Sequence, residues 1–323
     1  MKKIFITGES GTIPLAIQKI IATNKWPFEV INRQIPDRQL VAYKSHQSFS
    51  IRQPEIDFTN LEGFNHLFED VEIIIHSGAY VGTDFCKANP SEAIRTNVEG
   101  TKNIVDICNK FNIKLVYYST TAIFDPNDYG YDNPITEYTR INPQTLYGIT
   151  KYAGEMIVKR LCKTPKLILR PVFGFGDYPE DLHSALTKVI YTVLKPESNQ
   201  LNVLLDQKIC KSYTRVENIA LATLSLMISD VWNREINVGT HYSDAKNWDE
   251  LFEIIQKTCP QKLDFSKINF DGTQDYLHYH NIDNSKLLKW VPDFNFYYKL
   301  EDGILSTIKS VINNSNIKPY WMI

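Results

Sequence analysis

The segment from residue 147 to residue 151 reads Tyr-Gly-Ile-Thr-Lys, and its two ends carry residue types that can move a proton. On a helix, Tyr147 and Lys151 would lie on the same face. A tyrosine phenol has a pKa near about 10 in water, and a neighbouring ammonium group lowers it by favouring the phenolate. The hydroxyl of Thr120 could hold a substrate oxygen beside them. Together these residues predict a proton donor and acceptor that interconverts a carbinol and a carbonyl group.

A glycine-rich segment near the N-terminus gives this motif its context. Residues 3–7 are an apolar run typical of a buried strand, and residues 14–23 have the spacing of an amphipathic helix. A strand, a glycine turn and a helix N-terminus form an anion site, because the first N–H groups and the helix dipole face the ligand. We therefore expect a dinucleotide pyrophosphate at this turn, contacted by Gly8, Ser10, Gly11, Thr12 and Ile13.

Two residues of the turn depart from the usual fingerprint. Pro14 stands where a third glycine is expected, although proline is tolerated in the first turn of a helix. Glu9 adds a negative charge near the expected pyrophosphate, which would weaken binding if the side chain pointed inward. The sequence leaves open whether these two residues reduce the affinity for a cofactor.

The choice between NAD and NADP depends on the end of the second expected strand, residues 28–32. NAD sites usually have an acidic residue there, which binds the ribose hydroxyls. Here the strand ends with Asn32 and Arg33. Arg33 either pairs with a 2′-phosphate, which favours NADP(H), or is a solvated loop residue. Asp57 and Phe58 are further expected cofactor contacts, and Asp57 either accepts a hydrogen bond from the adenine amine or caps the following turn.

Apolar strands alternate with amphipathic helices through the first half of the chain. Strands are expected at residues 3–7, 28–32, 71–76, 114–119 and 166–170, and helices at residues 14–23, 61–68, 91–111 and 146–162. This alternation predicts an α/β fold with a doubly wound parallel sheet of the Rossmann type, covered by helices on both faces.

The pattern loosens after about residue 172, which predicts a second region. Residues 1–172 would form the dinucleotide-binding Rossmann domain, with a strand and a helix in residues 235–259 returning to it. Residues 173–234 and 260–323 would form a smaller C-terminal α/β substrate-binding region. Its last helix is expected at residues 300–313.

The composition argues against several classes of protein. The chain has 323 residues, 43% of them hydrophobic and 22% charged, which is typical of a globular protein with a large core. A net charge of −2 gives no support for binding nucleic acid or an anionic membrane, and no apolar stretch is long enough to span a bilayer. Five cysteines without a CxxC pair indicate free thiols in a reducing cytoplasm. The histidines lack partners at ligand spacing, so no metal is expected.

Six motifs in order resemble those of the extended short-chain dehydrogenase/reductase superfamily, whose members act mostly on nucleotide sugars. They are the glycine turn at residues 7–11, His-Ser-Gly-Ala-Tyr at 76–80, Asn-Val-Glu-Gly-Thr at 97–101, the segments 119–124 and 147–151, and Arg-Pro-Val at 170–172. Within that superfamily, residues 78–84 and 119–125 are most similar to the dTDP-4-dehydrorhamnose reductase family.

The resemblance implies a role for each matched residue. Tyr147 would be the general acid/base, Lys151 would bind the nicotinamide ribose and tune Tyr147, and Thr120 would hydrogen-bond the sugar oxygen. The cofactor would be NADP(H) or NAD(H), with further contacts from Ser77, Gly78, Ala79, Tyr80, Asn97, Ser119, Pro171 and Val172. The substrate contacts would be Val81, Thr121, Lys211 and Arg215. The last two are alternatives for binding the diphosphate of a nucleotide sugar, or else surface charges on a loop.

The implied function is an NAD(P)-dependent nucleotide-sugar oxidoreductase that reduces a 4-keto group by hydride transfer while Tyr147 protonates the oxygen. A nucleotide-sugar 4-epimerase or a C4 dehydrogenase with retained NAD would use the same residues. Thr121-Ala122 replaces the Asp-Glu pair of related 4,6-dehydratases, which argues against dehydration. The alternative of another class is a non-catalytic cofactor-binding regulatory subunit. By analogy with such folds, the helices at residues 91–111 and 146–162 would pair in a homodimer.

Overall fold

The computed structural model describes residues 2–8, 11–23, 28–30, 57–61, 63, 65–125, 133–172, 174–176, 184–195, 198, 200–203, 207–270, 281–294 and 299–313. Its centre is a six-stranded parallel sheet with the strand order β2-β1-β3-β4-β5-β9. The strands are β1 (Lys2–Thr7), β2 (Phe28–Val30), β3 (Ile73–His76), β4 (Lys114–Tyr118), β5 (Lys166–Pro171) and β9 (Arg234–Val238). The predicted α/β fold with a doubly wound parallel sheet is confirmed.

The order of strands reverses at β1, which pairs with β2 on one side and with β3 on the other. At such a switch point the loops after adjacent strands leave in opposite directions, and a ligand crevice opens at their carboxyl ends. Thr7, the last residue of β1, is in register with His76, the last residue of β3. Gly8 and Ser77 therefore follow neighbouring strand ends at this point of the sheet.

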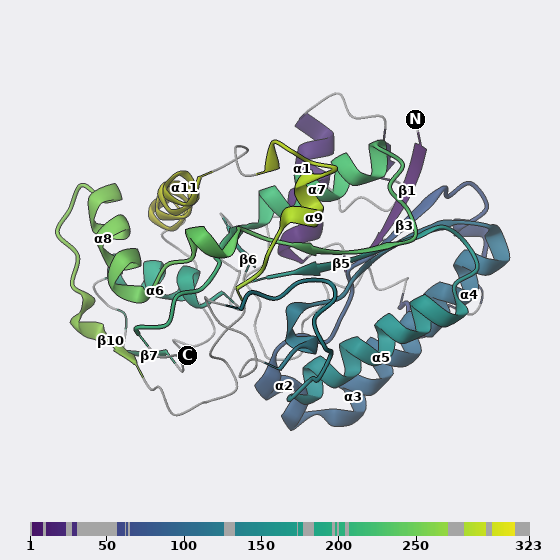
Figure 1. Ribbon diagram of the computed structural model, residues 1–323, viewed down its shortest axis with the longest axis horizontal. Coiled ribbons are helices and arrows are strands. Elements are labelled where there is room, and N and C mark those ends of the chain that lie inside the picture. The colour runs from purple at the N-terminus through teal and green to yellow at the C-terminus, as the bar shows by residue number, and fades with distance from the viewer. Residues whose placement is uncertain are drawn as a thin grey trace.

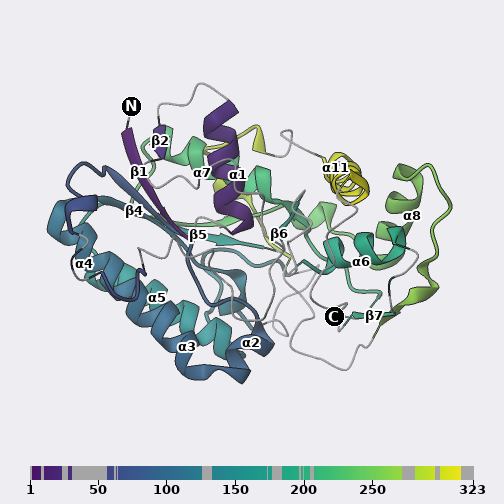
Figure 2. The same cartoon turned by 180° about the vertical axis from the view of Figure 1, so that it is seen from behind.

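Helices cover both faces of the sheet (Figures 1 and 2). α1 (Thr12–Thr23) and α7 (Val216–Ile228) pack together on one face, whereas α4 (Thr101–Phe111) and α5 (Leu146–Leu161) cover the other. Both faces of the strands are therefore buried. On β3, Ile73 and Ile75 belong to the core that contains residues of α1 and α7, and Ile74 belongs to the core that contains residues of α4 and α5. This double burial explains why the strands read as continuous apolar runs.

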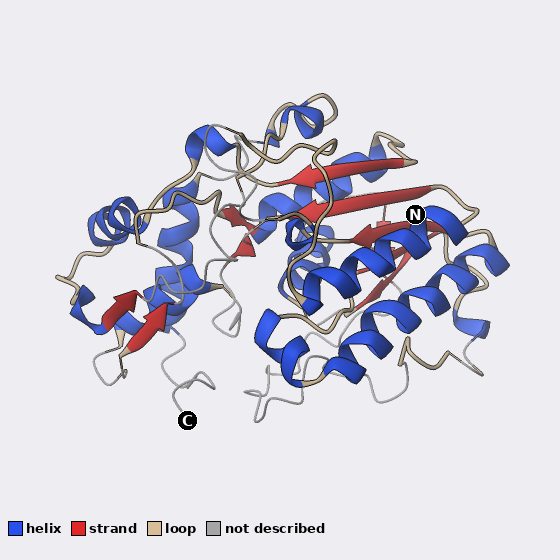
Figure 3. Cartoon of the chain, turned by 60° about the horizontal axis from the view of Figure 1, so that its bottom comes forward, coloured by secondary structure: helices blue, strands red, loops and turns tan. Residues whose placement is uncertain are grey.

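The C-terminal half adds a smaller group of elements with a core of its own, beside the sheet (Figure 3). These elements are β6 (Gly174–Phe175), α6 (Ala185–Leu194), β7 (Leu201–Val203), β8 (Thr214–Arg215), α8 (Trp248–Thr258), β10 (Ile268–Phe270) and α11 (Leu300–Asn313). β7 pairs with β10 and β6 with β8, both in parallel. α9 (Ser285–Leu288) returns to the core under α7 through Leu287. Within the described ranges, no helix is long and apolar enough to cross a membrane.

Two of the expected helices differ from the observed ones. The helix expected at residues 91–111 is divided into α3 (Pro90–Ile94), a π-helical turn η2 (Arg95–Gly100) and α4, and a further helix, α2 (Thr83–Ala88), precedes it. The helix expected at residues 61–68 is a 3-10 turn, η1 (Asn65–Leu67), in the described part of that range. Three more 3-10 turns are η3 (Thr121–Ile123), η4 (Tyr242–Asp244) and η5 (Phe265–Lys267).

The ring of Phe58 explains two of the glycines in the motifs. A Cβ on Gly78 would lie 2.6 Å from Phe58 Cε1, and a Cβ on Gly100 would lie 2.6 Å from Phe58 Cε2. The ring also contacts His76 edge-on, with 5.2 Å between the ring centroids. Phe58 is thus wedged between the segment after β3 and the end of the π-helical turn, and glycine is required on both sides of it.

We expect Gly100→Ala to lower the free energy of unfolding by about 1–3 kcal/mol, because the new methyl group overlaps the Phe58 ring in a packed interior. Urea denaturation measures this loss, and Phe58→Leu in the same chain should recover part of it. Gly174→Ala is the matched control, since its methyl would meet only side-chain ends of Val216 and Ile219, at 3.3 and 3.6 Å. Unchanged stability of Gly100→Ala would show that the Phe58 ring does not pack tightly against Gly100.

Candidate active site

The first turn of α5 is pressed against the turn that follows β4. The Thr145 side chain caps the helix, since its hydroxyl oxygen accepts a hydrogen bond from the Gly148 N–H at 3.1 Å. A Cβ on Gly148 would lie 2.2 Å from the carbonyl oxygen of Ala122, so only glycine permits this approach. The close packing places Tyr147, the neighbour of Gly148, beside Thr120.

Thr120 and Tyr147 meet through their side chains. The Ala122 N–H donates a hydrogen bond to Thr120 Oγ1 at 3.1 Å, and the Thr120 side chain is close enough to the Tyr147 phenol to lower its pKa. Because Thr120 Oγ1 already accepts from the backbone, its proton is available for the phenol oxygen. The structure therefore brings together the two hydroxyl groups that the sequence singled out.

Lys151 lies one turn further along α5 and is only 3% exposed. Its Nζ lies over the ring of Tyr117, 4.5 Å from the centroid, and the Tyr117 hydroxyl donates to the Lys151 carbonyl oxygen at 3.1 Å. Burial lowers the pKa of Lys151 to about 7, although the negative charge of Glu155 acts in the opposite direction. Near neutral pH, this lysine therefore exists in both protonation states.

The pKa of the Tyr147 phenol differs from the value expected from the sequence. Burial raises the pKa of this phenol to about 12, and the nearby Thr120 side chain offsets this only in part. The sequence predicted a lowered pKa because an ammonium group stands one turn away. That ammonium group is itself destabilised by burial, so desolvation dominates at both residues. At neutral pH Tyr147 is protonated and can donate its proton.

Hydrogen bonds link the glycine turn to the interior of the site. The Gly78 N–H donates to Thr7 Oγ1 at 3.0 Å, and Thr7 Oγ1 lies 2.7 Å from His76 Nδ1. On the other side of the ring, His76 Nε2 lies 3.0 Å from Thr101 Oγ1, which donates to the Asn97 carbonyl oxygen at 2.8 Å. Burial lowers the pKa of His76 to about 3, so the ring is neutral, with its proton on Nε2 facing Thr101.

Asn97 extends these contacts to α5. Its Oδ1 accepts from the Tyr80 N–H at 2.7 Å, and its Nδ2 donates to the Tyr80 carbonyl oxygen at 3.0 Å. The same Nδ2 donates to Thr150 Oγ1 at 3.0 Å, and the Thr150 hydroxyl donates to the Tyr147 carbonyl oxygen. Asn97 lies in the π-helical turn, a type of irregularity found frequently at functional sites. It fixes the segment after β3 relative to the first turn of α5.

The end of β1 fits the pyrophosphate of a dinucleotide. Gly8 has a φ of +66°, and a Cβ there would lie 2.6 Å from the Cα of Gly78. A Cβ on Gly11 would lie 3.2 Å from the Gly8 carbonyl oxygen. α1 begins at Thr12, so the N–H groups of Thr12 and Ile13 have no partner inside the helix. Pro14 falls in the first turn, where the missing N–H costs no hydrogen bond.

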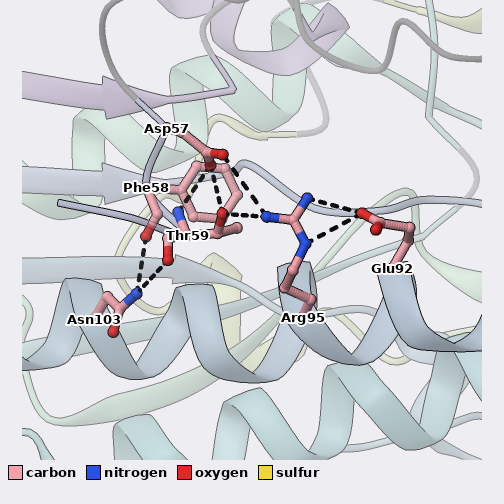
Figure 4. Close-up of polar contacts among 6 residues, drawn as sticks. All are labelled: Asp57, Phe58, Thr59, Glu92, Arg95 and Asn103. Carbon is pink, nitrogen blue, oxygen red and sulfur yellow. Dashed lines mark hydrogen bonds and ion pairs between the residues drawn. The ribbon is translucent and has the colours of Figure 1, made fainter.

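Asp57 is held by its own turn and by an arginine that the sequence analysis did not identify (Figure 4). Its Oδ1 accepts from the N–H and the hydroxyl of Thr59, at 2.9 and 2.7 Å. Its Oδ2 lies 3.7 Å from Arg95 Nη1, and Arg95 also pairs with Glu92 at 2.8 Å. Of the two roles expected for Asp57, the structure shows the turn cap.

Ser119 and Val172, both assigned to the cofactor site, lie at the ends of β4 and β5. The Ser119 hydroxyl donates to Glu155 Oε2 at 2.7 Å. Val172 is buried, and a Cβ on Gly239 would lie 2.2 Å from its Cγ1, so a close backbone approach holds it in place. Thr121 is buried beside Thr120. The remaining contacts expected here, all partly exposed, are Ser77, Ala79, Tyr80, Val81 and Pro171.

Lys211 and Arg215 are buried, so the interpretation that they are surface charges on a loop is wrong. The Lys211 backbone pairs with that of Lys246 through hydrogen bonds of 2.9 and 3.0 Å. Arg215 Nε donates to Glu217 Oε2 at 2.8 Å, and its Nη2 donates to Ser306 Oγ at 3.3 Å. These contacts tie Arg215 to α7 and α11. Three residues assigned to the cofactor site, Ser10, Asn32 and Arg33, lie outside the described ranges, and so does Glu9.

Comparison with known proteins identifies the family of this chain. The family model described as "RmlD substrate binding domain" matches residues 1–269. The chain belongs to this RmlD family. A putative UDP-glucose 4-epimerase of Methanocaldococcus jannaschii is 29% identical to it over 97% of this chain and 99% of the relative. Other curated relatives are named as nucleotide-sugar reductases and dehydratases, so the resemblance to the extended short-chain dehydrogenase/reductases is confirmed.

Solved structures show the same fold as this RmlD family member. RMD of Pseudomonas aeruginosa, in a complex with NADPH, superposes with a TM-score of 0.76 at 17% identity, covering 97% of this chain and 100% of that one. The UDP-glucuronic acid 4-epimerase of Bacillus cereus, in a complex with NAD, superposes with a TM-score of 0.77 at 18% identity, covering 99% and 100%.

Three buried residues near the site of this RmlD family member were not identified from the sequence. Glu155 and Arg170 form an ion pair next to Ser119, and Cys86 lies near Lys151, whose charge acts on the thiol. Glu155 continues the spacing of Tyr147 and Lys151 by another four residues, so the helical period carried a signal for it. In the part of the chain that the structure describes, no cluster of three or more His, Cys, Asp or Glu could hold a metal ion.

The lowered pKa of Lys151 predicts a pH dependence of stability. Between its folded pKa of about 7 and its ordinary value of 10.5, the unfolded chain holds a proton that the folded chain has released. The free energy of unfolding should therefore rise with pH, by roughly 1.5 kcal/mol from pH 7 to 8.5. Lys151→Met should remove this rise. Above about pH 9, thiols with raised pKa values such as Cys86 act in the opposite direction.

Chemical denaturation of the wild type and of Lys151→Met at intervals across pH 6 to 8.5 measures this difference. Subtracting the two curves cancels every titration that the proteins share. Two parallel curves would show that Lys151 keeps an ordinary pKa in the folded protein.

Proposed function

We propose that this chain is an NAD(P)-dependent nucleotide-sugar oxidoreductase that reduces a 4-keto group. The observation that carries the proposal is the meeting of the Thr120 and Tyr147 hydroxyls one helical turn from a buried lysine. This pairing places a protonated phenol and a positioning hydroxyl side by side, as protonation of a carbonyl oxygen requires. The family and its nucleotide-sugar relatives support the substrate class.

In this proposal each residue of the chain has a separate task. The nicotinamide cofactor supplies the hydride when it is bound. Thr120 donates a hydrogen bond to the carbonyl oxygen of the sugar and holds it beside Tyr147. Tyr147 gives its phenolic proton to the same oxygen. Lys151, when protonated, stabilises the phenolate that remains and would bind the nicotinamide ribose. Because its pKa is about 7, a fraction of the molecules carries the positive charge on Lys151 near neutral pH, although the side chain is buried.

The turn after β1 supports a dinucleotide as the cofactor. The left-handed Gly8, its contact with Gly78 and the open N-terminus of α1 suit a pyrophosphate, and Val172 would lie beside the nicotinamide. The structural neighbours in complexes with NADPH and with NAD support either dinucleotide. The elements of the C-terminal half around α6, α8 and α11 would form the region that binds the nucleotide sugar.

A 4-epimerase is the second candidate, and a specific observation favours it. A relative that aligns over nearly the whole of both chains is a putative UDP-glucose 4-epimerase. The same Tyr147 would then remove a proton and later return it, while the cofactor stays bound. Buried Thr121, next to Ala122, leaves no acid for a leaving hydroxyl, which continues to argue against dehydration.

We also propose that the chain forms a homodimer in the cytoplasm. α5 exposes Ile149 and Leu161, and the end of α3 exposes Ile94, by 45 to 50% of their surface. Pairing of these helices with a second copy would bury them. All five cysteines are free thiols, which suits a reducing compartment. Light scattering of the purified protein tests the dimer, and a monomeric mass would reject it.

Tyr147→Phe should abolish turnover, with a fall of about 10² to 10⁴-fold in kcat, because the proton donor is lost while the ring is kept. Two assays give the readout: oxidation of NADPH with dTDP-4-dehydrorhamnose, and conversion of UDP-glucose to UDP-galactose without added cofactor. NADPH binding, measured by its fluorescence, should be unchanged.

The matched control is Tyr152→Phe, one turn further along α5 on a partly buried tyrosine. It should retain wild-type turnover. The assay that detects activity decides between the reductase and the epimerase. If Tyr147→Phe turned over normally, the residue would not be the proton donor. If the wild type bound NADPH and turned over no nucleotide sugar, the regulatory-subunit alternative would gain support.

A further inference from the structure

One buried carboxylate joins the three segments that carry the proposed reaction. Glu155, on α5, is 0% exposed. Its Oε2 accepts from the Ser119 hydroxyl at 2.7 Å and from Arg170 Nε at 3.1 Å. Its Oε1 accepts from Arg170 Nη2 at 2.6 Å. The end of β4, the middle of α5 and the end of β5 are therefore held by the two oxygens of a single side chain.

Each of these contacts lies next to a residue of the proposed site. Ser119 precedes Thr120, Glu155 follows Lys151 by one turn, and Arg170 stands two residues before Val172. We propose that Glu155 is a positioning residue, whose carboxylate fixes Thr120, the Tyr147–Lys151 pair and Val172 relative to one another. The inference rests on the proposed function, since it concerns how that same site is held in place.

The ion pair of Glu155 and Arg170 fixes the orientation of both side chains as well as balancing their charges. Arg170 is 1% exposed, binds both oxygens of the carboxylate through two nitrogens, and lies over the ring of Phe124, 5.4 Å from its centroid. A two-point contact of this kind fixes direction in a way that a single contact does not. Lys159 Nζ also lies 3.9 Å from Glu155 Oε1, but it is paired with Glu235 at 2.9 Å.

The charge of Glu155 also acts on Lys151. It raises the pKa of that lysine against the lowering by burial, so it keeps part of the population protonated near neutral pH. The other titratable groups around Lys151 come from every neighbouring element. They are His76 at the end of β3, Cys86 on α2, Tyr117 on β4 and Tyr147 on α5, with Arg170 of β5 behind the carboxylate. Among these groups, Glu155 is the one carboxylate.

The test compares three variants of the full chain. Glu155→Gln keeps the shape and removes the charge, but it leaves Arg170 buried without a counter-charge. The double variant Glu155→Gln with Arg170→Gln removes both charges and keeps the folded state accessible. Glu235→Gln is the matched control, because it removes a carboxylate that pairs with Lys159 on the outer side of the same cluster. Circular dichroism and thermal unfolding show which variants fold.

Two readouts separate a positioning role from a merely structural one. In protein labelled with ¹³C-lysine, the ¹³Cε shift of Lys151 follows its protonation, and Lys151→Arg assigns the signal. In the folded double variant the titration should move to lower pH by roughly one unit. With NADPH and dTDP-4-dehydrorhamnose, kcat should fall by about 10²-fold, the alkaline limb of the pH profile should move to lower pH, and KM should stay within about twofold. Glu235→Gln should change neither readout.

A folded double variant with the wild-type titration of Lys151 and the wild-type pH profile would overturn the proposal. Loss of folding in both Glu155 variants would overturn it as well, because the carboxylate would then be needed for stability alone. The titration requires no turnover, so it is informative even if the proposed reaction is wrong. An active Tyr147→Phe would reject the reaction, whereas an unshifted Lys151 titration with an inactive Tyr147→Phe would reject only the role of Glu155.

Discussion

The close approach of α5 to the strand ends is the constraint on which the site depends. Gly148 lies where a Cβ would be 2.2 Å from the Ala122 carbonyl oxygen, and Gly154 lies where it would be 2.4 Å from the Tyr117 hydroxyl. With a glycine at each of these places, the helix sits directly on the sheet, and Lys151 between them is removed from water. Desolvation of this lysine, rather than its charge, then sets the electrostatics of the site.

A buried lysine of this kind must have partners, and the fold supplies them from several elements. The ring of Tyr117 lies under the ammonium group, and the carboxylate of Glu155 stands one turn away. Removing one member of the Glu155–Arg170 pair would leave the other charged and buried, at a cost of about 3–5 kcal/mol. Hydrogen bonds through His76 and Asn97 then connect this helix to the glycine turn. The first turns of α5 and the glycine turn after β1 are thus parts of one hydrogen-bonded structure.

Local patterns were enough to predict the sheet and the helix that carries Tyr147 and Lys151. The apolar runs at residues 71–76 and 166–170 correspond to β3 and β5, and the helical spacing of Tyr147 and Lys151 placed both correctly on α5. Patterns of this type depend on burial and on helical period, which the sequence carries locally. The helix at residues 91–111 was predicted without its π-helical turn, because that turn depends on contacts of Asn97 with Tyr80 and Thr150. Side-chain contacts between distant segments leave no periodic trace.

The electrostatics of the site were the least predictable part. Helical spacing suggested that Lys151 lowers the pKa of Tyr147, whereas the structure shows that burial raises it. Spacing reveals which groups are neighbours, but the degree of burial decides which protonation state is favoured. The same limit applies to Lys211 and Arg215, whose charges suggested a surface loop, although both are buried. Each contacts a residue more than thirty positions away, Lys246 for Lys211 and Ser306 of α11 for Arg215, which the local pattern does not reveal.

The measurement that tests the account most directly is mass spectrometry of the small molecules released when the purified protein is denatured, followed by titration of the empty protein with NADPH and NADH. The account predicts either a released nicotinamide dinucleotide, as in an epimerase, or an empty site that binds NADPH reversibly, as in a reductase. A protein that releases neither dinucleotide and binds neither would contradict the assignment of the β1 turn and of the whole site as an oxidoreductase centre.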